Sequence, residues 1–97
     1  METLRKIDAN TVEGEGFIVT IPDIHYVYYI EGNRKLTMEI EGAEDPEGHI
    51  YWYLYTKSMS GWLPPYETQI LSRQERQKIH NRIVDSLRFL GTQLKLE

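Results

Sequence analysis

Few residues of this 97-residue chain have the type and spacing that catalysis needs. The histidines His25, His49 and His80 are far apart in sequence, and none has the i, i+3 or i+4 spacing of a helical metal pair. There is no cysteine, which excludes thiolate metal sites, cysteine nucleophiles and disulfides. No serine lies in a Gly-x-Ser-x-Gly context, and Gly14-x-Gly16 lacks the third glycine of a dinucleotide site. We therefore expect no catalytic residue, no cofactor and no bound metal, and we expect that the chain is not an enzyme.

Carboxylates gather in the middle of the chain. They are Glu39, Glu41, Glu44, Asp45 and Glu47. Their spacing is not that of an EF-hand calcium loop, so a solvated acidic hairpin loop over residues 41–48 is the expected structure. An acidic stretch of this kind can steer a basic partner, raising the association rate more than the affinity. We predict that Glu44, Asp45 and Glu47 contact a protein partner.

The charge is unevenly distributed along the chain. The formal net charge is −4, with 12 acids and 5 bases in residues 1–71 and 6 bases and 3 acids in residues 72–97. The acidic balance argues against general nucleic-acid binding, which depends on positive charge near phosphates. No apolar run reaches about 18 residues, and the N-terminus lacks the apolar segment of a secretory signal. We expect a cytoplasmic protein with no membrane partner.

Residue periodicity predicts strands in the first two thirds of one domain, residues 1–97. The expected strands are Phe17–Ile21, Ile24–Glu31, Lys35–Glu41 and His49–Thr56, with a weaker one around Arg5–Glu13. Apolar residues then recur at helical spacing, at Ile79, Ile83, Leu87 and Leu90. Ser72 and Glu75 form a capping box before this stripe, Gly91 ends it, and Thr92–Leu96 alternates like a short strand. The expected fold is α+β: an antiparallel β-meander with one C-terminal helix packed on one face and a short final strand.

The Gly32-Asn33 turn fixes which side chains share a face of this sheet. A two-residue type II′ turn pairs Tyr29 with Leu36 and Val27 with Met38, which places these four side chains under the helix. The opposite face then carries tyrosines from two strands: Tyr26, Tyr28, Tyr51, Tyr53 and Tyr55. Tyrosine is enriched at protein interfaces, so these residues are a candidate binding surface. Two alternatives remain open: a tyrosine ladder that only stabilises an exposed sheet, or N-terminal strands that fold over it.

A stiff segment connects the last meander strand to the helix. It contains Trp62-Leu-Pro64-Pro65-Tyr66, whose prolines fix φ and favour extended backbone. Burial of Trp62 and Tyr66 against the helix end would make the segment an anchor that orients the helix. We nevertheless predict that Trp62, Pro64, Pro65 and Tyr66 contact the protein partner, as a preorganised binding edge that loses little entropy on association.

This segment and the helix resemble a family of small bacterial immunity proteins from polymorphic-toxin systems. The resemblance is carried by Trp62-x-Pro64-Pro65-Tyr66, followed by Ile79, Arg82-Ile83, Ser86-Leu87 and Phe89-x-Gly91 before a closing strand. It covers about the C-terminal 40 residues, and the meander matches only in general character. The resemblance implies a cytoplasmic protein that neutralises a toxin by stoichiometric binding, and it supplies no catalytic residue.

Two other interpretations compete with toxin binding. The helix face of residues 72–90 carries Arg73, Arg76, Lys78, Arg82 and Arg88 against only Glu75 and Asp85, and could serve a small nucleic-acid-binding or regulatory module. Base-reading motifs are absent, so an exposed polar helix face is the simpler explanation. A homodimer joined across the tyrosine face is the other alternative.

Overall fold

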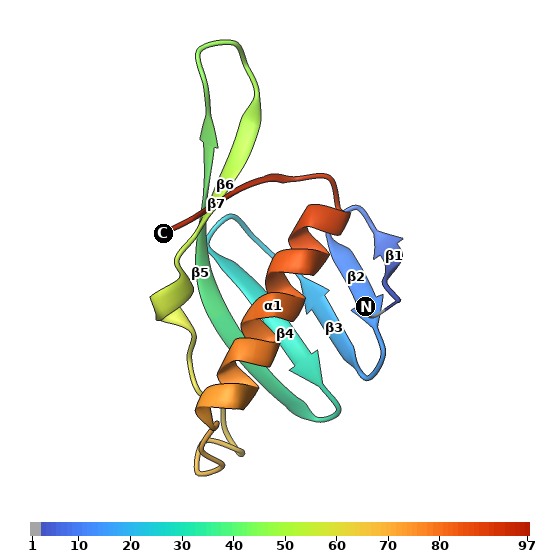
Figure 1. Cartoon of the computed structure of the whole chain (residues 1–97), viewed down its shortest axis with the longest axis vertical. Helices are drawn as coiled ribbons and strands as arrows, with labels where there is room; N and C mark the ends of the chain where they lie inside the picture. Colours follow the sequence, from blue (N-terminus) through green and yellow to red (C-terminus); the bar gives the residue numbers. More distant parts are fainter. Residues whose placement is uncertain (1–2) are drawn as a thin grey trace.

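Seven strands form a single sheet, and one helix lies across one of its faces (Figure 1). The computed structural model describes residues 3–97. Along the chain, the strands are β1 (Arg5–Asp8), β2 (Thr11–Gly14), β3 (Phe17–Thr20), β4 (Tyr26–Glu31), β5 (Arg34–Glu44), β6 (Ile50–Leu54) and β7 (Gln93–Leu96). Their spatial order follows the sequence; neighbours are antiparallel except β6 and β7, which are parallel. A short 3₁₀ helix η1 (Thr56–Ser58) and the helix α1 (Arg73–Phe89) stand between β6 and β7. The predicted α+β meander with one helix and a final strand is confirmed.

The predicted strand boundaries differ most from the structure at two places. The expected strand Arg5–Glu13 is two strands, because the chain turns at residues 9–10, where the Asp8 carboxylate accepts the N–H of Asn10 at 2.8 Å. The strand predicted to end at Glu41 runs on to Glu44, since residues 40–44 pair with residues 50–54. Half of the predicted acidic loop is therefore strand.

The turn at Gly32 sets the faces as predicted. Tyr29 is paired with Leu36 and Val27 with Met38, and all four side chains are fully buried. Gly32 has a φ of 61°, the left-handed value that the first central residue of a type II′ turn requires.

The core lies between this face of the sheet and α1. The helix contributes Ile79, Ile83 and Leu87, which are buried against the β3, β4 and β5 side chains. Burying an aliphatic side chain of this size contributes roughly 1.5–3 kcal/mol, so these contacts hold the helix on the sheet. Phe89 lies off the apolar stripe and is 49% exposed. No helix within residues 3–97 has the length and apolar character needed to cross a membrane.

Both ends of α1 are closed as the sequence predicts. At the start, Ser72 Oγ accepts the N–H of Glu75 at 3.1 Å, and Glu75 Oε1 accepts the N–H of Ser72 at 3.0 Å. At the end, Gly91 adopts a φ of 84°. The N–H of Gly91 then reaches the Arg88 carbonyl at 2.9 Å, and the N–H of Thr92 reaches the Leu87 carbonyl at 3.4 Å. This is a Schellman motif, in which a glycine in the left-handed region ends the helix.

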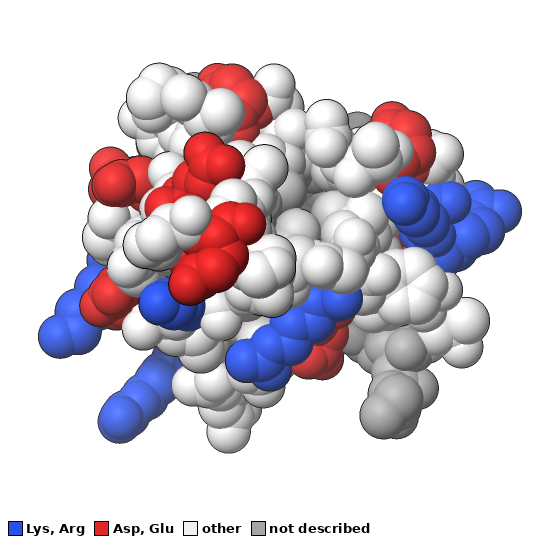
Figure 2. Space-filling view, turned by 90° about the horizontal axis from the view of Figure 1, so that it is seen from above, with Lys and Arg blue, Asp and Glu red and all other residues white. Residues whose placement is uncertain are grey.

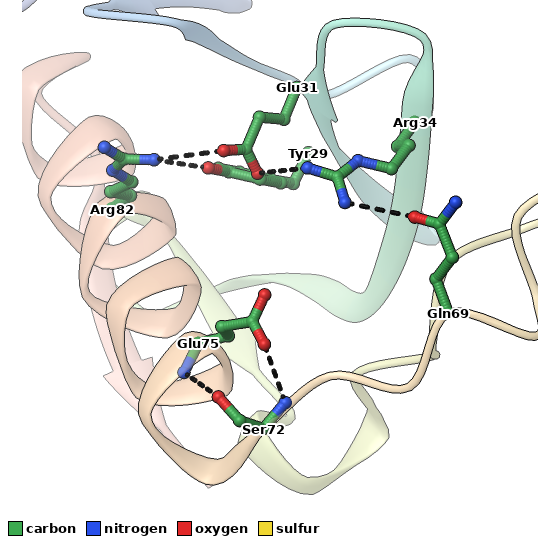
Figure 3. A network of polar contacts seen from close by, with 7 residues as sticks. All are labelled: Tyr29, Glu31, Arg34, Gln69, Ser72, Glu75 and Arg82. Carbon is green, nitrogen blue, oxygen red and sulfur yellow. Dashed lines mark hydrogen bonds and ion pairs between the residues drawn. The ribbon is translucent and has the colours of Figure 1, made fainter.

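Arg82 is not on the exposed helix face, and the prediction that it belongs to a solvent-facing basic surface is wrong. Its side chain is 9% exposed and lies 4.4 Å over the Phe17 ring. Arg82 Nη1 donates to the Tyr29 hydroxyl at 2.7 Å, and Glu31 Oε1 is 4.0 Å away (Figure 3). The guanidinium therefore ties the helix to β4 from inside the fold.

Candidate functional site

The hairpin of β5 and β6 projects beyond the rest of the molecule (Figure 1). We call residues 41–53 the arm. Gly42 faces Trp52 across it, and a Cβ on Gly42 would lie 3.3 Å from the Trp52 ring, so the glycine lets the indole pack flat on the strand. The arm contributes to the elongated shape of the molecule, which measures 45 × 26 × 22 Å. It presents a narrow, ordered element that a partner could surround from several sides.

Asp45 organises the tip of the arm. One carboxylate oxygen accepts the N–H groups of Glu47 at 3.0 Å and His49 at 2.8 Å, and the other lies 3.1 Å from His49 Nδ1. The N–H of Gly48, which has a φ of 86°, donates to the Asp45 carbonyl at 2.9 Å. The hydrogen bond from the His49 backbone N–H lowers the pKa of Asp45, so this carboxyl stays ionised well into the acid range. Asp45 shapes the turn.

Glu44 and Glu47 are the exposed carboxylates of the tip. Neither forms an ion pair with another residue of the described chain, although Glu47 lies close enough to Asp45 to affect the pKa of that carboxyl. The arm as a whole contains four carboxylates and no lysine or arginine. Figure 2 looks down onto the arm and shows acidic side chains gathered there. Ile50, next to the turn, is 66% exposed and adds an apolar contact.

Asp45, Glu47 and His49 also bring one potential ligand atom each within 4.8 Å of one another. The prediction that no histidine is spaced i, i+3 or i+4 from another histidine or a suitable carboxylate is wrong for His49, which lies four residues after Asp45; here a turn, and not a helix, brings the two side chains together. Asp45 and His49 already bond to each other and hold the turn. The side chains of Asp45 and His49 are thus accounted for by the turn itself, whereas the Glu47 carboxylate is exposed beside them.

The tyrosine face lies opposite α1, as the register predicts. Tyr26 is 40% exposed, and Tyr28, Tyr51, Tyr53 and Tyr55 are half-buried. None of the five is enclosed by the described part of the chain, so the N-terminal strands do not fold over them.

Contacts with one another and with neighbouring charged side chains hold several of these rings in place. The Tyr51 and Tyr53 rings meet edge to face at 5.4 Å, and Lys95 Nζ lies 4.4 Å from the Tyr51 centroid. Tyr55 donates its hydroxyl to Glu41 at 2.8 Å, and this bond raises the pKa of Tyr55. A hydrogen bond with Tyr51 raises the pKa of Tyr53. The arm and its base therefore offer aromatic rings that are held in place before a partner binds.

An open groove lies where the arm joins the body. It has a volume of about 490 Å³ and is lined by His25, Tyr26, Glu39, Ile40, Glu41 and Tyr55. Ile24, 64% exposed, precedes His25 in the loop between β3 and β4. The sequence analysis assigned Glu39 and Glu41 to the acidic cluster without placing them beside Tyr26 and Tyr55. Only the sheet register joins these residues, through the pairs Tyr26–Glu39 and Glu41–Tyr53.

The Trp62–Tyr66 segment lies at the opposite end of the molecule from the arm (Figure 1). Trp62 is 3% exposed, with its ring 6.3 Å from Tyr29 and the Arg34 guanidinium 4.6 Å above it. Tyr66 is half-buried against the core, and Pro64 and Pro65 are exposed. The geometry matches the anchoring interpretation, and the structure does not bring this segment together with the acidic and tyrosine groups.

The site described so far is a projecting acidic hairpin beside an open tyrosine face. A family model described as Immunity protein 74 matches residues 18–97, from β3 to the last residue. The chain therefore belongs to the Immunity protein 74 family, and this membership supports a toxin-neutralising function. No curated protein and no solved structure matches it.

Proposed function

We propose that this protein neutralises a toxin in the cytoplasm by binding it stoichiometrically, without chemistry of its own. The toxin-binding surface is the arm together with the tyrosine face at its base. The observation that carries the proposal is the arm: Glu44, Glu47 and Ile50 stand exposed on a hairpin that contributes little to the core. An element that stability does not require is free to serve recognition.

The charge of the arm indicates the kind of toxin surface that it fits. Four carboxylates without a lysine or arginine favour a basic surface on the toxin. The exposed acids speed the encounter, whereas Ile50 and the tyrosines supply buried contact area once the complex has formed. Asp45 holds the tip in shape before binding, which reduces the entropy lost on association.

A charge-reversal experiment tests the proposal. The partner is a toxin domain found by examining the genes that neighbour this one. Its association with the wild type and with Glu44→Lys/Glu47→Lys is followed by surface plasmon resonance. We expect one toxin per chain for the wild type. The double variant should associate about tenfold more slowly at low salt, because reversing two charges removes the steering field.

The matched control is Glu15→Lys/Glu67→Lys. It makes the same charge change at two exposed positions away from the arm, in the β2–β3 turn and in the loop before α1. The control should bind and protect cells as the wild type does. Equal losses in the two variants would mean that net charge, and not the arm, governs binding. Failure of the wild type to bind the neighbouring toxin would overturn the proposed function.

Analytical ultracentrifugation tests whether the tyrosine face joins two copies of this chain instead of binding a toxin. A homodimer joined across it would hide the surface that we assign to the toxin. A mass near the 11.5 kDa of one chain supports toxin binding through this face, and a stable dimer contradicts it.

A further inference from the structure

A second groove, on the other side of the chain segment that follows β6, has the opposite electrostatic character. It lies between η1 and the first two turns of α1 and has a volume of about 530 Å³. The lining residues are Thr56, Lys57, Met59, Arg73, Arg76, Gln77 and His80. Every polar side chain among them can donate a hydrogen bond, and no carboxylate lines the groove. In a chain with a net charge of −4, this is a local concentration of cations.

The cations in this groove are not compensated within the fold. Within residues 3–97, Lys57, Arg73 and Arg76 form no ion pair. Glu75, the one acid of the first helical turn, is occupied by the capping box with Ser72. Arg73 and Arg76 also stand near the positive end of the helix, where cations are unfavourable. Their placement therefore costs stability unless an anion lies between them.

The groove has a defined wall. Arg76 donates to the Met59 carbonyl at 3.4 Å, which bridges the helix to the segment after η1. His80, half-buried in the wall, has an enclosed Nδ1 with no hydrogen-bond partner among the described residues. This nitrogen is closed off from solvent, so it helps to form the wall and is not itself a contact for a ligand in the groove.

We propose that this groove binds the phosphate groups of a polyphosphate or a nucleic-acid strand. Guanidinium groups bind phosphate oxygens through paired N–H donors, and Lys57 adds a mobile point charge. This inference is independent of toxin binding through the arm. The sequence predicts a basic surface over the whole exposed face of the helix. The proposed site includes only the basic residues that line the groove, and the buried Arg82 is not among them.

The test titrates the isotopically labelled whole protein at low salt with inorganic pyrophosphate and with a short single-stranded oligonucleotide, followed by NMR. We expect saturable shifts confined to residues 56–59 and 73–80. The variant Arg73→Gln/Arg76→Gln should bind about tenfold or more weakly, because two charge-assisted contacts are lost. The control Lys78→Gln/Arg88→Gln removes the same charge from exposed positions of α1 that do not line the groove.

Each outcome decides the question. If pyrophosphate binds and the oligonucleotide does not, the groove binds a free polyphosphate. If the oligonucleotide binds more tightly than pyrophosphate, and pyrophosphate displaces it, the groove binds a nucleic-acid backbone. Shifts spread over the whole surface, or equal losses in the two variants, would show non-specific attraction and overturn the proposal. The proposal is also overturned if neither probe binds. If the groove variant then weakens toxin binding, the groove contacts an acidic segment of the toxin. The chemical-shift changes of the wild-type protein still locate the binding site if the groove variant fails to fold.

Discussion

Individual side chains at the arm tip show how one carboxylate can define a binding element. Asp45 uses both oxygens on the turn that it begins, whereas Glu44 and Glu47 beside it have no such duty. The three acids look equivalent in the sequence, which predicts the same partner-binding role for all of them. In the structure Asp45 positions the tip, whereas Glu44 and Glu47 are exposed to solvent.

The order of the tip should depend on pH through Asp45. Its pKa is lowered in the folded protein, so its stabilising effect is complete above the pKa of an unfolded aspartate and is lost as pH falls through the lowered value. Amide hydrogen exchange of Gly48 and His49 should therefore accelerate, relative to the unfolded chain, under strongly acidic conditions. The amide of Gly91 is an internal control, because it donates to the Arg88 carbonyl in a turn that has no carboxylate cap. Parallel loss of protection in both turns would point to global unfolding instead.

Residue-level prediction failed where a contact depended on distant parts of the chain. Arg82 follows the helical spacing of an exposed basic face, yet it bonds to Tyr29, which is 53 residues away. The apolar stripe of α1 gave no sign that an arginine beside it would be buried. The burial of Trp62 agrees with its interpretation as an anchor. Two prolines and two aromatic residues before a capped helix indicate that the chain enters the helix in a fixed direction.

At the scale of elements, α1 and the β4–β5 hairpin were predicted well because their signals are local. The capping box, the apolar stripe and Gly91 lie within 20 residues, and the hairpin register follows from one glycine. The extension of β5 through Gly42, Ala43 and Glu44 was missed, since these residues have low strand propensity. Pairing with β6 overrides that propensity.

The capping box gives a test at this scale. Ser72→Ala should lower the free energy of unfolding by about 1 kcal/mol, because the N–H of Glu75 loses its acceptor. The measurement is urea denaturation followed by far-UV circular dichroism. Thr68→Ala, an exposed substitution in the preceding loop, should stay within about 0.5 kcal/mol of the wild type. Equal effects of the two substitutions would argue against the cap.

Another element-level feature explains why β5 does not act as an open edge. The first half of β5 does not pair with β6. There, the hydroxyl oxygens of Ser58 and Ser60 accept the N–H groups of Glu39 and Thr37 at 2.8 and 3.0 Å. The N–H of Leu63 then donates to the Lys35 carbonyl at 2.8 Å. The loop thus covers backbone that would otherwise pair with another chain.

Across the whole molecule, the core and the proposed recognition surface are separated. The buried side chains lie under α1, whereas the arm extends past it (Figure 1). The meander and the single helix could be predicted from sequence, since neighbouring strands are also neighbours in the chain. The projection of the arm, its distance from Trp62 and the parallel pairing of β7 depend on long-range packing that no local pattern encodes.

Because the arm is separate from the core, we predict that it can be shortened without loss of the fold. Replacing residues 44–50 by Asn-Gly leaves the Ala43–Tyr51 pair beside a two-residue turn, which suits an antiparallel hairpin. The thermal unfolding midpoint should change by only a few degrees, because the deleted residues are largely exposed. Toxin binding, measured by calorimetry, should fall at least about tenfold. Full binding by the shortened protein would move the site elsewhere.

The pairing of β7 with β6 has a practical consequence for work with this protein. Glu97 accepts hydrogen bonds from the Thr56 backbone and hydroxyl at 3.1 and 2.9 Å, so the last residue is fastened beside the base of the arm. A fluorescent or affinity domain joined after Glu97 would be held close to the surface under study and could shield it. The sheet edge formed by β1 lies six strands away, and a label attached on that side would leave the arm unobstructed.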